Sequence, residues 1–359
     1  MNRYAVILAA GKGSRMKSRD ENMSKVSYPI LGKPLVRYVL DAIKPLDLEK
    51  TVVVVGFGGN TTTQIVKDRA DVVWQHELLG TGHALMQADP LLGDKKGVTI
   101  VLCGDTPLLT TKTLEKLFKK HEHSEASMTI LTAVIENPHG YGRIIRDKSN
   151  AVVAIREQKD CSEAETYIKE INSGVYIFDN EKLFKYLKKI KNNNAQNEYY
   201  LTDLVDLFVK DNLRVEAYVV EDFEETSGIN DRLQLSAAAK VLRKRINETL
   251  MISGVGIEDP ETTYISPDVR IGRDTIISPN TTILGNSEIG EGNLIGPNTY
   301  LENVYVGDDN KITFSHITNS TIDSNNNIGP FVRIRDNVVV VKDHDIENFT
   351  ELKNVTLKK

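Results

Sequence analysis

The sequence predicts an α/β domain built on a doubly wound sheet, followed by a parallel β-helix. From residue 4 to about 220, short aliphatic runs alternate with helical patterns, which is typical of α/β domains. From residue 265 onward, an aliphatic residue recurs every six positions, which is typical of hexapeptide repeats. The length of 359 residues also favours two domains over one. We therefore expect a first domain at 1–229, a connector helix at 230–250 and a β-helix at 251–359.

The first domain alternates predicted strands and helices. The strands lie at 4–10, 51–56, 98–103 and 128–135, and the helices at 34–46, 112–123 and 180–194. The run Val52 to Val55 has no polar alternation, which indicates strands covered on both faces of a mostly parallel sheet. Such sheets bind ligands at the carboxyl ends of their strands. His121 and His123 fall among charged residues at a helix end, so we expect them on a solvated face.

The connector helix carries apolar residues on one face only, which predicts packing on one side. These residues are Leu235, Ala238, Ala239, Leu242 and Ile246.

The β-helix is predicted by two runs of aliphatic residues with a six-residue period. The first run is Ile265, Ile271, Ile277, Ile283, Ile289, Ile295 and Leu301. After a slip of phase, the second run is Ile322, Ile328, Ile334, Val340, Ile346 and Leu352. We expect these side chains to point inward, with Gly, Asn and Asp at the corners of roughly five coils of about 18 residues.

Composition excludes several classes of function. The chain has 45 basic and 50 acidic residues, well mixed, so no broad cationic face is expected for nucleic acid. Its two cysteines, Cys103 and Cys161, cannot form a disulfide framework or a four-cysteine metal site, and they fit a reducing cytoplasm. The apolar start at 4–10 is much shorter than a membrane span, so no membrane partner is expected.

A glycine-rich turn follows the first predicted strand. Gly11 and Gly13 would let backbone N–H groups approach phosphate oxygens, and Lys12, Arg15 and Lys25 add positive charge. Alone, this turn also fits a tight surface turn with solvated cations. Its spacing matches neither a Walker loop nor a GxGxxG fingerprint, which disfavours kinases and dehydrogenases.

Eight motifs, the first of which contains this turn, follow one another along the chain in a recognisable order. They are LAAGKGSRM at 8–16, QHELLGTGHA at 75–84, GDTPL at 104–108, GYGRI at 140–144, EQKD at 157–160, EINSG at 170–174, NAQNEYYLTD at 194–203 and GIN at 228–230. In this order they resemble the bacterial N-acetylglucosamine-1-phosphate uridyltransferases, and the similarity extends into the β-helix.

The resemblance implies a fold, a reaction and a setting. The fold is a Rossmann-like, doubly wound mixed sheet of the nucleotide-diphospho-sugar transferase type, followed by a left-handed parallel β-helix. The reaction joins UTP and N-acetylglucosamine 1-phosphate into UDP-N-acetylglucosamine, with release of pyrophosphate and dependence on Mg²⁺. The resemblance also implies a cytoplasmic homotrimer, assembled through the β-helix, in cell wall precursor biosynthesis.

Nucleotidyl transfer needs no covalent protein nucleophile, because an oxygen of the sugar phosphate attacks the α-phosphate directly; the protein positions and neutralises charge. The resemblance assigns Arg15 and Lys25 to the phosphates. Asp105 and Asn230 fit an Mg²⁺ pair, since Mg²⁺ prefers oxygen ligands and keeps several waters. Asp105 follows the strand at 98–103, where a ligand belongs, but either residue also fits a helix cap.

The resemblance also assigns the other substrate contacts. The predicted nucleotide-binding residues are Leu8, Ala9, Ala10, Gly11, Gly13, Gln75, Gly80 and Thr81. The predicted sugar-binding residues are Gly140, Glu157, Asn172 and Thr202. We expect His83 to position its loop, because the attacking phosphate is already ionised and needs no base.

Three departures from the family leave alternatives open. The segment 17–24 is three residues longer than usual, with Ser24 where proline is usual, and Leu78 often corresponds to glutamine, so another sugar or base remains open. Arg333 and Lys353 match acetyltransferase positions, but the catalytic histidine segment that should follow is absent, so we expect acetyl transfer to be lost. A catalytically weak, truncated β-helix paralogue with a regulatory or structural role is the remaining alternative.

Overall fold

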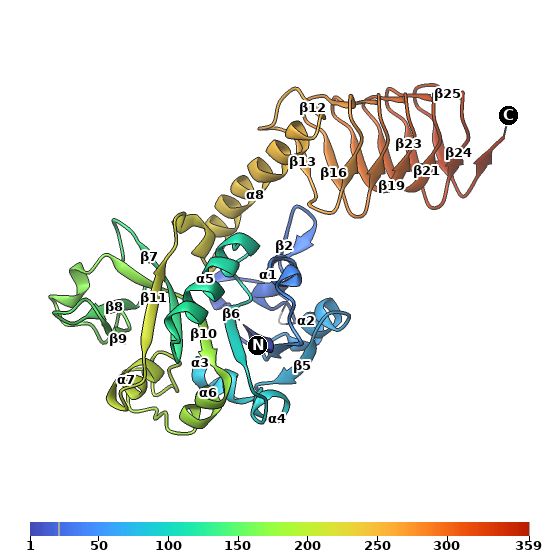
Figure 1. Ribbon diagram of the computed structural model, residues 1–359. Helices are drawn as coiled ribbons and strands as arrows, with labels where there is room; N and C mark the ends of the chain where they lie inside the picture. The colour runs from blue at the N-terminus through green and yellow to red at the C-terminus, as the bar shows by residue number, and fades with distance from the viewer. Residues whose placement is uncertain (21, 359) are drawn as a thin grey trace. The chain divides into compact units, whose positions relative to one another are not determined.

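The structure is a computed structural model that describes residues 1–20 and 22–358; Glu21, inside the segment 17–24, and Lys359 lie outside the described residues. The chain forms two compact units (Figure 1). Unit 1 comprises Met1–Tyr28 and Pro34–Leu235, and unit 2 comprises Pro29–Lys33 and Ser236–Lys359. The predicted boundaries at 229/230 and 250/251 stay predictions, while the two units divide between Leu235 and Ser236.

Unit 1 is built on a mixed sheet with strand order β11-β7-β10-β6-β1-β4-β5. The strands are β1 (Arg3–Ala9), β4 (Lys50–Val55), β5 (Asp71–Trp74), β6 (Val98–Cys103), β7 (Met128–Val134), β10 (Glu170–Asp179) and β11 (Val215–Val219). β10 runs antiparallel to β6 and β7, and the other neighbours on this path are parallel. The predicted α/β class with a doubly wound mixed sheet is confirmed.

The central strands are buried on both faces. In β1, Tyr4 and Val6 belong to one hydrophobic core, and Ala5 and Ile7 to the other. The same division separates Val52 and Val54 from Val53 and Val55 in β4. This explains why these strands are continuously apolar, since neither face meets water.

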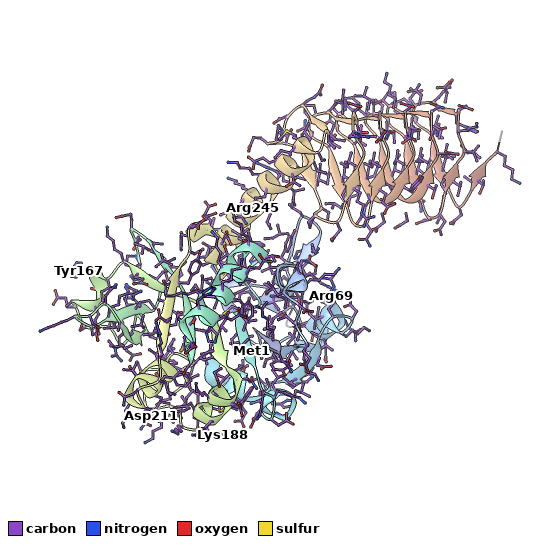
Figure 2. The ribbon with its side chains drawn as sticks, viewed as in Figure 1. Met1, Arg69, Tyr167, Lys188, Asp211 and Arg245 are labelled. Carbon is purple, nitrogen blue, oxygen red and sulfur yellow. The ribbon has the colours of Figure 1, made fainter. Side chains whose placement is uncertain are left out.

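Helices and short elements complete unit 1. The α-helices are α1 (Leu35–Ile43), α2 (Gly59–Val66), α3 (Thr81–Met86), α4 (Asp89–Leu92), α5 (Thr111–Ser124), α6 (Asn180–Leu187) and α7 (Asp203–Lys210). The 3₁₀ turns are η1 (Ser14–Met16), η2 (Lys25–Ser27), η3 (Lys44–Leu46), η4 (Glu165–Tyr167) and η5 (Phe223–Thr226). A small extension pairs β8 (Arg143–Arg146) with β9 (Val152–Arg156), and the nearby Tyr167 of η4 is exposed (Figure 2). No helix among the described residues combines the length and the hydropathy that crossing a bilayer requires.

The expectation for the histidines of α5 is wrong for His121. His121 is buried, and its Nδ1 lies 2.8 Å from the hydroxyl of Thr129, whereas His123 is exposed. The buried stripe of α5 contains Leu114, Leu117 and Phe118, and position 121 continues it one turn further. Burial lowers the pKa of His121 to about 4.

Helix α8 (Arg232–Ile252) follows unit 1 and continues into unit 2. Ala238 and Leu242, from its predicted apolar face, are buried. Arg243 is also buried and pairs with Glu261, and Asn247 Nδ2 donates to the carbonyl oxygens of Pro260 and Thr263, each at 3.0 Å. The helix is therefore tied to the first coil by polar contacts as well as by apolar packing.

Unit 2 is a parallel β-helix, as predicted (Figure 1). Its strands stack in three rows, and every pair is parallel. The first row is β12 (Gly256–Ile257), β15 (Ile276–Ile277), β18 (Leu294–Ile295), β20 (Lys311–Ile312), β22 (Asn327–Ile328) and β25 (Asp345–Ile346). The second row is β13 (Tyr264–Ile265), β16 (Thr282–Leu284), β19 (Tyr300–Val306), β21 (His316–Ile322), β23 (Arg333–Arg335) and β26 (Glu351–Lys353). The third row adds β14 (Arg270–Ile271), β17 (Glu288–Ile289), β24 (Val339–Val340) and β27 (Thr356–Leu357), with β19 and β21 between β17 and β24. A separate pair joins β2 (Pro29–Ile30) to β3 (Lys33–Pro34).

The slip of phase has a structural cause. Thr282 pairs with Tyr300, eighteen positions along, but Tyr300 pairs with His316, only sixteen along. The shorter coil is accommodated where β19 and β21 run without a break from one face to the next. The predicted inward residues on both sides of the slip are buried or nearly so.

Buried asparagines form a ladder inside the β-helix. Asn293 Oδ1 accepts from the backbone N–H of Asn310 at 2.8 Å, and Asn310 Oδ1 accepts from that of Asn326 at 2.9 Å. Asn326 Oδ1 in turn accepts from the backbone N–H of His344 at 2.9 Å. Each coil thus satisfies a buried donor of the next coil.

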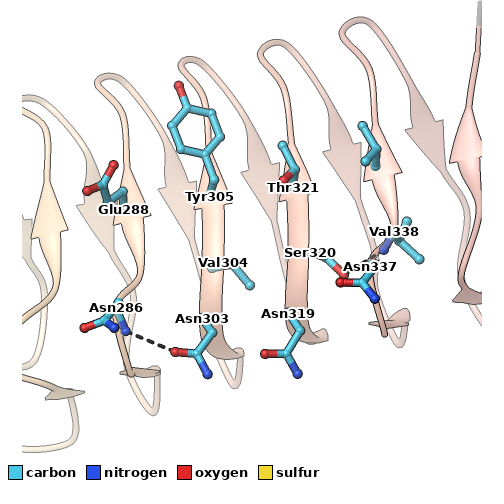
Figure 3. A pocket seen from close by; sticks show the side chains of 11 residues that line it. Asn286, Glu288, Asn303, Val304, Tyr305, Asn319, Ser320, Thr321, Asn337 and Val338 are labelled. Atoms are coloured by element: carbon cyan, nitrogen blue, oxygen red, sulfur yellow. Dashed lines mark hydrogen bonds between the residues drawn. The ribbon is translucent and has the colours of Figure 1, made fainter.

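The outer surface of unit 2 carries an open groove of about 570 Å³, seen in Figure 3. Asn286, Asn303, Asn319 and Asn337 form a row along it. Three of them, Asn303, Asn319 and Asn337, have φ values of 52°, 46° and 65°. Asparagine tolerates this left-handed conformation better than most residues, so the corners of the coils account for the row.

Candidate active site

A cleft of about 380 Å³ opens in unit 1 at the carboxyl ends of β1 and β6. It brings together most of the predicted nucleotide-binding residues, the phosphate-binding Lys25 and the predicted metal ligand Asp105. The predicted residues that line it are Leu8, Ala9, Ala10, Gly11, Lys25, Gln75, Gly80, Thr81 and Asp105. Leu78 and Cys103 also line it. The chain therefore gathers segments separated by about a hundred positions into one site, as expected for the switch edge of a doubly wound sheet.

The glycine-rich turn has two structural requirements. Gly13 has φ 60°, and a Cβ there would lie 2.6 Å from Cβ of Lys25, so only glycine lets the turn approach η2. A Cβ at Gly11 would meet nothing within 4 Å, so its backbone is open to a ligand. The turn is thus closed toward the protein and accessible at Gly11.

The longer segment before Lys25 is anchored at its end. The Ser24 hydroxyl lies 2.8 Å from that of Ser27 and 2.7 Å from that of Thr62, and the Ser27 and Thr62 hydroxyls lie 3.1 Å apart. All three residues are buried. Three mutually bonded hydroxyls satisfy one another, since each donates once and accepts once. The buried hydroxyl cluster therefore fixes Ser24, the residue immediately before Lys25.

Two oxygens and two cations meet at the predicted metal site. The Lys25 ammonium donates to Asp105 Oδ2 and, at 3.0 Å, to Asn230 Oδ1. Arg15 Nη2 also donates to Asn230 Oδ1, at 2.9 Å. The backbone N–H of Ile229 donates to the Asp105 carbonyl oxygen at 2.9 Å, which holds the Asn230 segment beside the end of β6. Asp105 and Asn230 thus present a carboxylate and an amide oxygen to the same ammonium group, that of Lys25.

This donor set fits a hard divalent cation. Among the described residues, no group of three or more His, Cys, Asp or Glu side chains could hold a metal ion alone. A cation bound by Asp105 and Asn230 would complete its coordination with water and phosphate oxygens. Cys103 does not fit as a nucleophile, because burial raises the pKa of its thiol to about 12.

The predicted base-binding residues surround the start of α3. Gln75 follows β5 and is buried, and its Nε2 donates to the Gly80 carbonyl oxygen at 3.0 Å. Gly80 has φ 103°, and a Cβ there would lie 2.7 Å from the Tyr199 carbonyl oxygen. Thr81 Oγ1 accepts from the backbone N–H of Leu201 at 3.2 Å. The segment at 199–201 therefore fixes the loop that carries Gly80 and Thr81.

The predicted sugar-binding residues form a second group. Thr202 Oγ1 donates to Glu157 Oε1 at 3.2 Å, and burial raises the pKa of Glu157. A Cβ at Gly142 would lie 3.5 Å from both Glu157 Oε1 and Asn172 Cβ, so these two side chains converge on the same glycine. Gly140 is exposed, and its N–H donates to Gln158 Oε1 at 2.9 Å. The group therefore offers carboxylate, amide and hydroxyl oxygens together.

Asn172 is held by residues that sequence reasoning did not select. The register of β10 against β7 shifts between Asn172 and Val175. Asn172 Nδ2 donates to the Tyr176 hydroxyl at 2.7 Å, and its Oδ1 accepts from the Gly174 N–H at 3.1 Å. Tyr176 is only 3% exposed. Its phenol fixes the side-chain amide of Asn172 from behind.

Arg143 is the second residue missed. It is 1% exposed, donates to the Tyr141 carbonyl oxygen, and donates from Nη2 to Gln158 Oε1 at 2.9 Å. The same Gln158 oxygen accepts from Gly140, so one buried guanidinium holds the Gly140 turn against the segment after β9. In the sequence, only its position inside the GYGRI motif could have indicated a role for Arg143.

A mixed, doubly wound sheet whose cleft joins an open glycine turn to a predicted cation site is typical of a nucleotide-dependent group transferase. Residues 4–233 match the nucleotidyl transferase family, and residues 260–358 match the GMPPB C-terminal domain. The chain therefore belongs to the nucleotidyl transferase family and is an enzyme of that class. Enzymes of this family generally depend on a divalent metal, and their substrates belong to the nucleotide-sugar class.

Several relatives align with the whole chain. The bifunctional protein GlmU of Geobacillus sp. (strain WCH70) is 47% identical over 359 residues, which cover 100% of this chain and 78% of that protein. Its counterpart in Halalkalibacterium halodurans is 45% identical over 358 residues, with 100% and 78% covered. That of Enterococcus faecalis is 46% identical over 356 residues, with 99% and 77% covered. The resemblance expected from the eight motifs is confirmed.

Proposed function

We propose that the protein forms UDP-N-acetylglucosamine and pyrophosphate from UTP and N-acetylglucosamine 1-phosphate. The proposal depends on one observation: the oxygens of Asp105 and Asn230 converge on the Lys25 ammonium, beside the open turn at Gly11. A phosphate-rich substrate needs both a cation and free backbone donors at one place. The similarity to the bifunctional GlmU proteins supports the choice of base and sugar.

The reaction is an in-line displacement at the α-phosphorus of UTP. An oxygen of the sugar 1-phosphate forms the new P–O bond while the bond between the α- and β-phosphates breaks, and pyrophosphate leaves. Arg15 and Lys25 neutralise the charge that develops on the leaving group. We propose Mg²⁺ as the metal: Asp105 and Asn230 would hold it, and it would supply further charge neutralisation.

The remaining assignments follow the two polar groups. Gln75, Gly80 and Thr81 bind the uracil end of the nucleotide, and Leu8, Ala9, Ala10, Gly11 and Gly13 bind its phosphates. Gly140, Glu157, Asn172 and Thr202 bind the N-acetylglucosamine unit, whose hydroxyls and acetamido group match these oxygens and amides. Leu78 is exposed and lines the cleft, where it can affect which base or sugar fits. Other nucleotides and sugar phosphates should therefore be tested as well.

Pyrophosphate release with Mg²⁺ and UTP, scanned over a panel of sugar 1-phosphates, tests the reaction. We expect N-acetylglucosamine 1-phosphate to be the best substrate and removal of the metal by a chelator to abolish release. Asp105→Ala and Asn230→Ala should each lower kcat/KM by about 100-fold or more. The exposed Asp94→Asn is the matched control and should leave the rate unchanged. No release with any sugar contradicts the reaction, and full activity in both alanine variants contradicts the metal site.

The cytoplasmic homotrimer is also a proposal. Unit 2 carries an exposed row of aromatic rings, with Phe314 and Phe331 centred 5.7 Å apart and Phe331 and Phe349 5.5 Å apart. A second copy that covers such a row would remove apolar surface from water. Sedimentation equilibrium should give three times the chain mass, and a concentration-independent monomer contradicts the proposal.

A further inference from the structure

We propose that His83 strengthens the choice of base because, together with the Gly80 carbonyl oxygen, it fixes the amide of Gln75 with its own oxygen toward the nucleotide. His83 itself needs no contact with the substrate, so it is a positioning residue. The inference rests on the proposed function, because it takes Gln75 as a contact of the base. It adds a physical reason why uracil is selected over cytosine.

The orientation of the Gln75 amide follows from its two partners. Nε2 lies 3.0 Å from the Gly80 carbonyl oxygen and 3.1 Å from His83 Nδ1. A carbonyl oxygen accepts but cannot donate, so the NH₂ end of the amide must face Gly80. The reversed amide would bring two carbonyl oxygens together in a buried place, because Gln75 is only 4% exposed.

The second N–H of the amide reaches His83. Since an NH₂ group has two hydrogens, one bonds Gly80 and the other bonds Nδ1, which must therefore carry its lone pair. The neutral ring then has its proton on Nε2. Both donors of Gln75 are occupied, and its Oε1 accepts no hydrogen bond from the described residues.

A second glutamine approaches the other ring nitrogen but does not reverse this assignment. Gln87 Nε2 lies 3.3 Å from His83 Nε2 and 3.0 Å from the His83 carbonyl oxygen. Gln87 Nε2 already donates to the His83 carbonyl oxygen, so its longer contact with the ring is not needed as a hydrogen bond. The shorter contact of the buried Gln75 therefore decides which ring nitrogen carries the lone pair. The competition for His83 is therefore settled by Gln75.

The free oxygen of Gln75 discriminates between pyrimidines. Gln75 lines the cleft, so Oε1 is the group it offers to a base. Uracil carries an N–H at ring position 3, whereas cytosine carries a lone pair there. A fixed acceptor bonds the first and repels the second, and sites that satisfy a substrate N–H reject analogues without it strongly. Fixing the amide thus converts a side chain with both donor and acceptor ends into an acceptor alone.

The test compares UTP and CTP in variants of His83. His83→Leu removes the acceptor at Nδ1 and leaves one N–H of Gln75 without a partner, so the Gly80 carbonyl oxygen alone holds the amide, which is then less firmly oriented. We expect the ratio of kcat/KM for UTP over CTP to fall by about 10-fold or more. In His83→Asn, the amide oxygen stands near the former Nδ1 and accepts the same bond, so most of the ratio should return. His76→Leu is the matched control, because His76 is exposed on the same segment and stacks on Trp74.

Several outcomes overturn the inference. If His83→Leu lowers kcat/KM equally for UTP and CTP, His83 only supports the loop. If the wild-type enzyme has a ratio of kcat/KM for UTP over CTP near one, it does not select between these bases at all. Calorimetric binding of UTP and CTP with Mg²⁺ repeats the comparison without any sugar. It separates this inference from the proposed reaction, because a preference for UTP that depends on His83 survives a wrong sugar assignment. A thermal melt of each variant identifies a loss that comes from unfolding.

Discussion

Single residues decide how the predicted contact residues are oriented. Tyr176, Arg143 and His83 each bond a predicted binding residue or its immediate neighbour, and Tyr176 and Arg143 are almost fully buried. Their hydrogen bonds are made before the substrate arrives. A contact residue that is already oriented loses less conformational freedom on binding, so we expect the buried residues to contribute to affinity without touching the ligand.

Tyr176→Phe tests this for the sugar group. The change leaves the Asn172 Nδ2 donor without its acceptor, while the ring still fills the core. One lost hydrogen bond costs about 0.5–1.5 kcal/mol, so KM for the sugar 1-phosphate should rise about 2- to 10-fold. KM for UTP should stay the same in steady-state kinetics. Tyr186→Phe removes a buried phenol that bonds Asp211 and serves as the control. Equal rises in both KM values would indicate a general loss of packing.

Asp203 gives a dependence of stability on pH. Burial and then the charge of Asp206 raise its pKa from 3.8 to about 6, although it begins helix α7, where a carboxylate is normally favoured. The folded state therefore binds more protons than the unfolded state between these values, and this group lowers stability as pH rises through 3.8 to about 6. Asp203→Asn should raise Tm more at pH 7.5 than at pH 4. The same gain at both values would show that the charge is not the cause.

The candidate contact residues could be selected from the sequence, and the buried residues that bond to them could not. Asp105, Gln75 and Asn172 stand in motifs with fixed spacing, and the structure gathers their segments into unit 1. Tyr176 has the pattern of an ordinary core residue in a strand, and Arg143 that of an exposed one. His121 was placed wrongly because its charged neighbours masked the buried stripe of its helix. Which face of an element is buried depends on what packs against it, and one sequence does not record that.

At the scale of elements, the six-residue period predicted the β-helix but not the length of its coils. Val306, Ile312 and Ile317 point inward across the slip at spacings of six and five, so a strict period misses them. The interior asparagines were also missed as a ladder, since asparagine at a coil normally indicates a corner. The six-residue period describes the average coil, whereas individual coils depart from it locally at their corner residues and buried asparagines.

Asn310→Ala tests the contribution of the ladder. Asn310 is buried, accepts from the Asn326 N–H and donates from Nδ2 to Asn293 Oδ1 at 3.1 Å. Its loss leaves buried backbone and amide groups unpaired, which costs about 1–3 kcal/mol for each. Chemical denaturation of the β-helix should shift to lower denaturant accordingly. Asn327→Ala, exposed on a strand of the next coil, should have an effect below about 0.5 kcal/mol. Equal shifts in the two variants would mean that the ladder adds nothing.

At the scale of the whole molecule, the two halves have separate interiors. The sheet of unit 1 is covered by two hydrophobic cores, and the β-helix of unit 2 has its own. The change of period after the connector helix predicted this division. The sequence did not predict that Pro29–Lys33 belongs to unit 2. In the structure, Lys33 Nζ forms an ion pair with Asp268 Oδ1 of that unit at 2.8 Å. Five residues are too few to carry a periodic signal, so sequence patterns cannot assign such a segment.

Separate interiors predict separate unfolding. In differential scanning calorimetry, we expect two transitions, and Mg²⁺ with UTP should raise only that of unit 1, because the whole candidate site lies there. At 100 times Kd the ligand adds about 2.7 kcal/mol to the stability of the unit that binds it. Asn310→Ala should lower only the other transition. If the ligand and the substitution move one common transition, the units unfold together, and the interior of each is then insufficient to define a domain. If they move different transitions, each interior is a cooperative unit, and nucleotide binding is a property of the first alone.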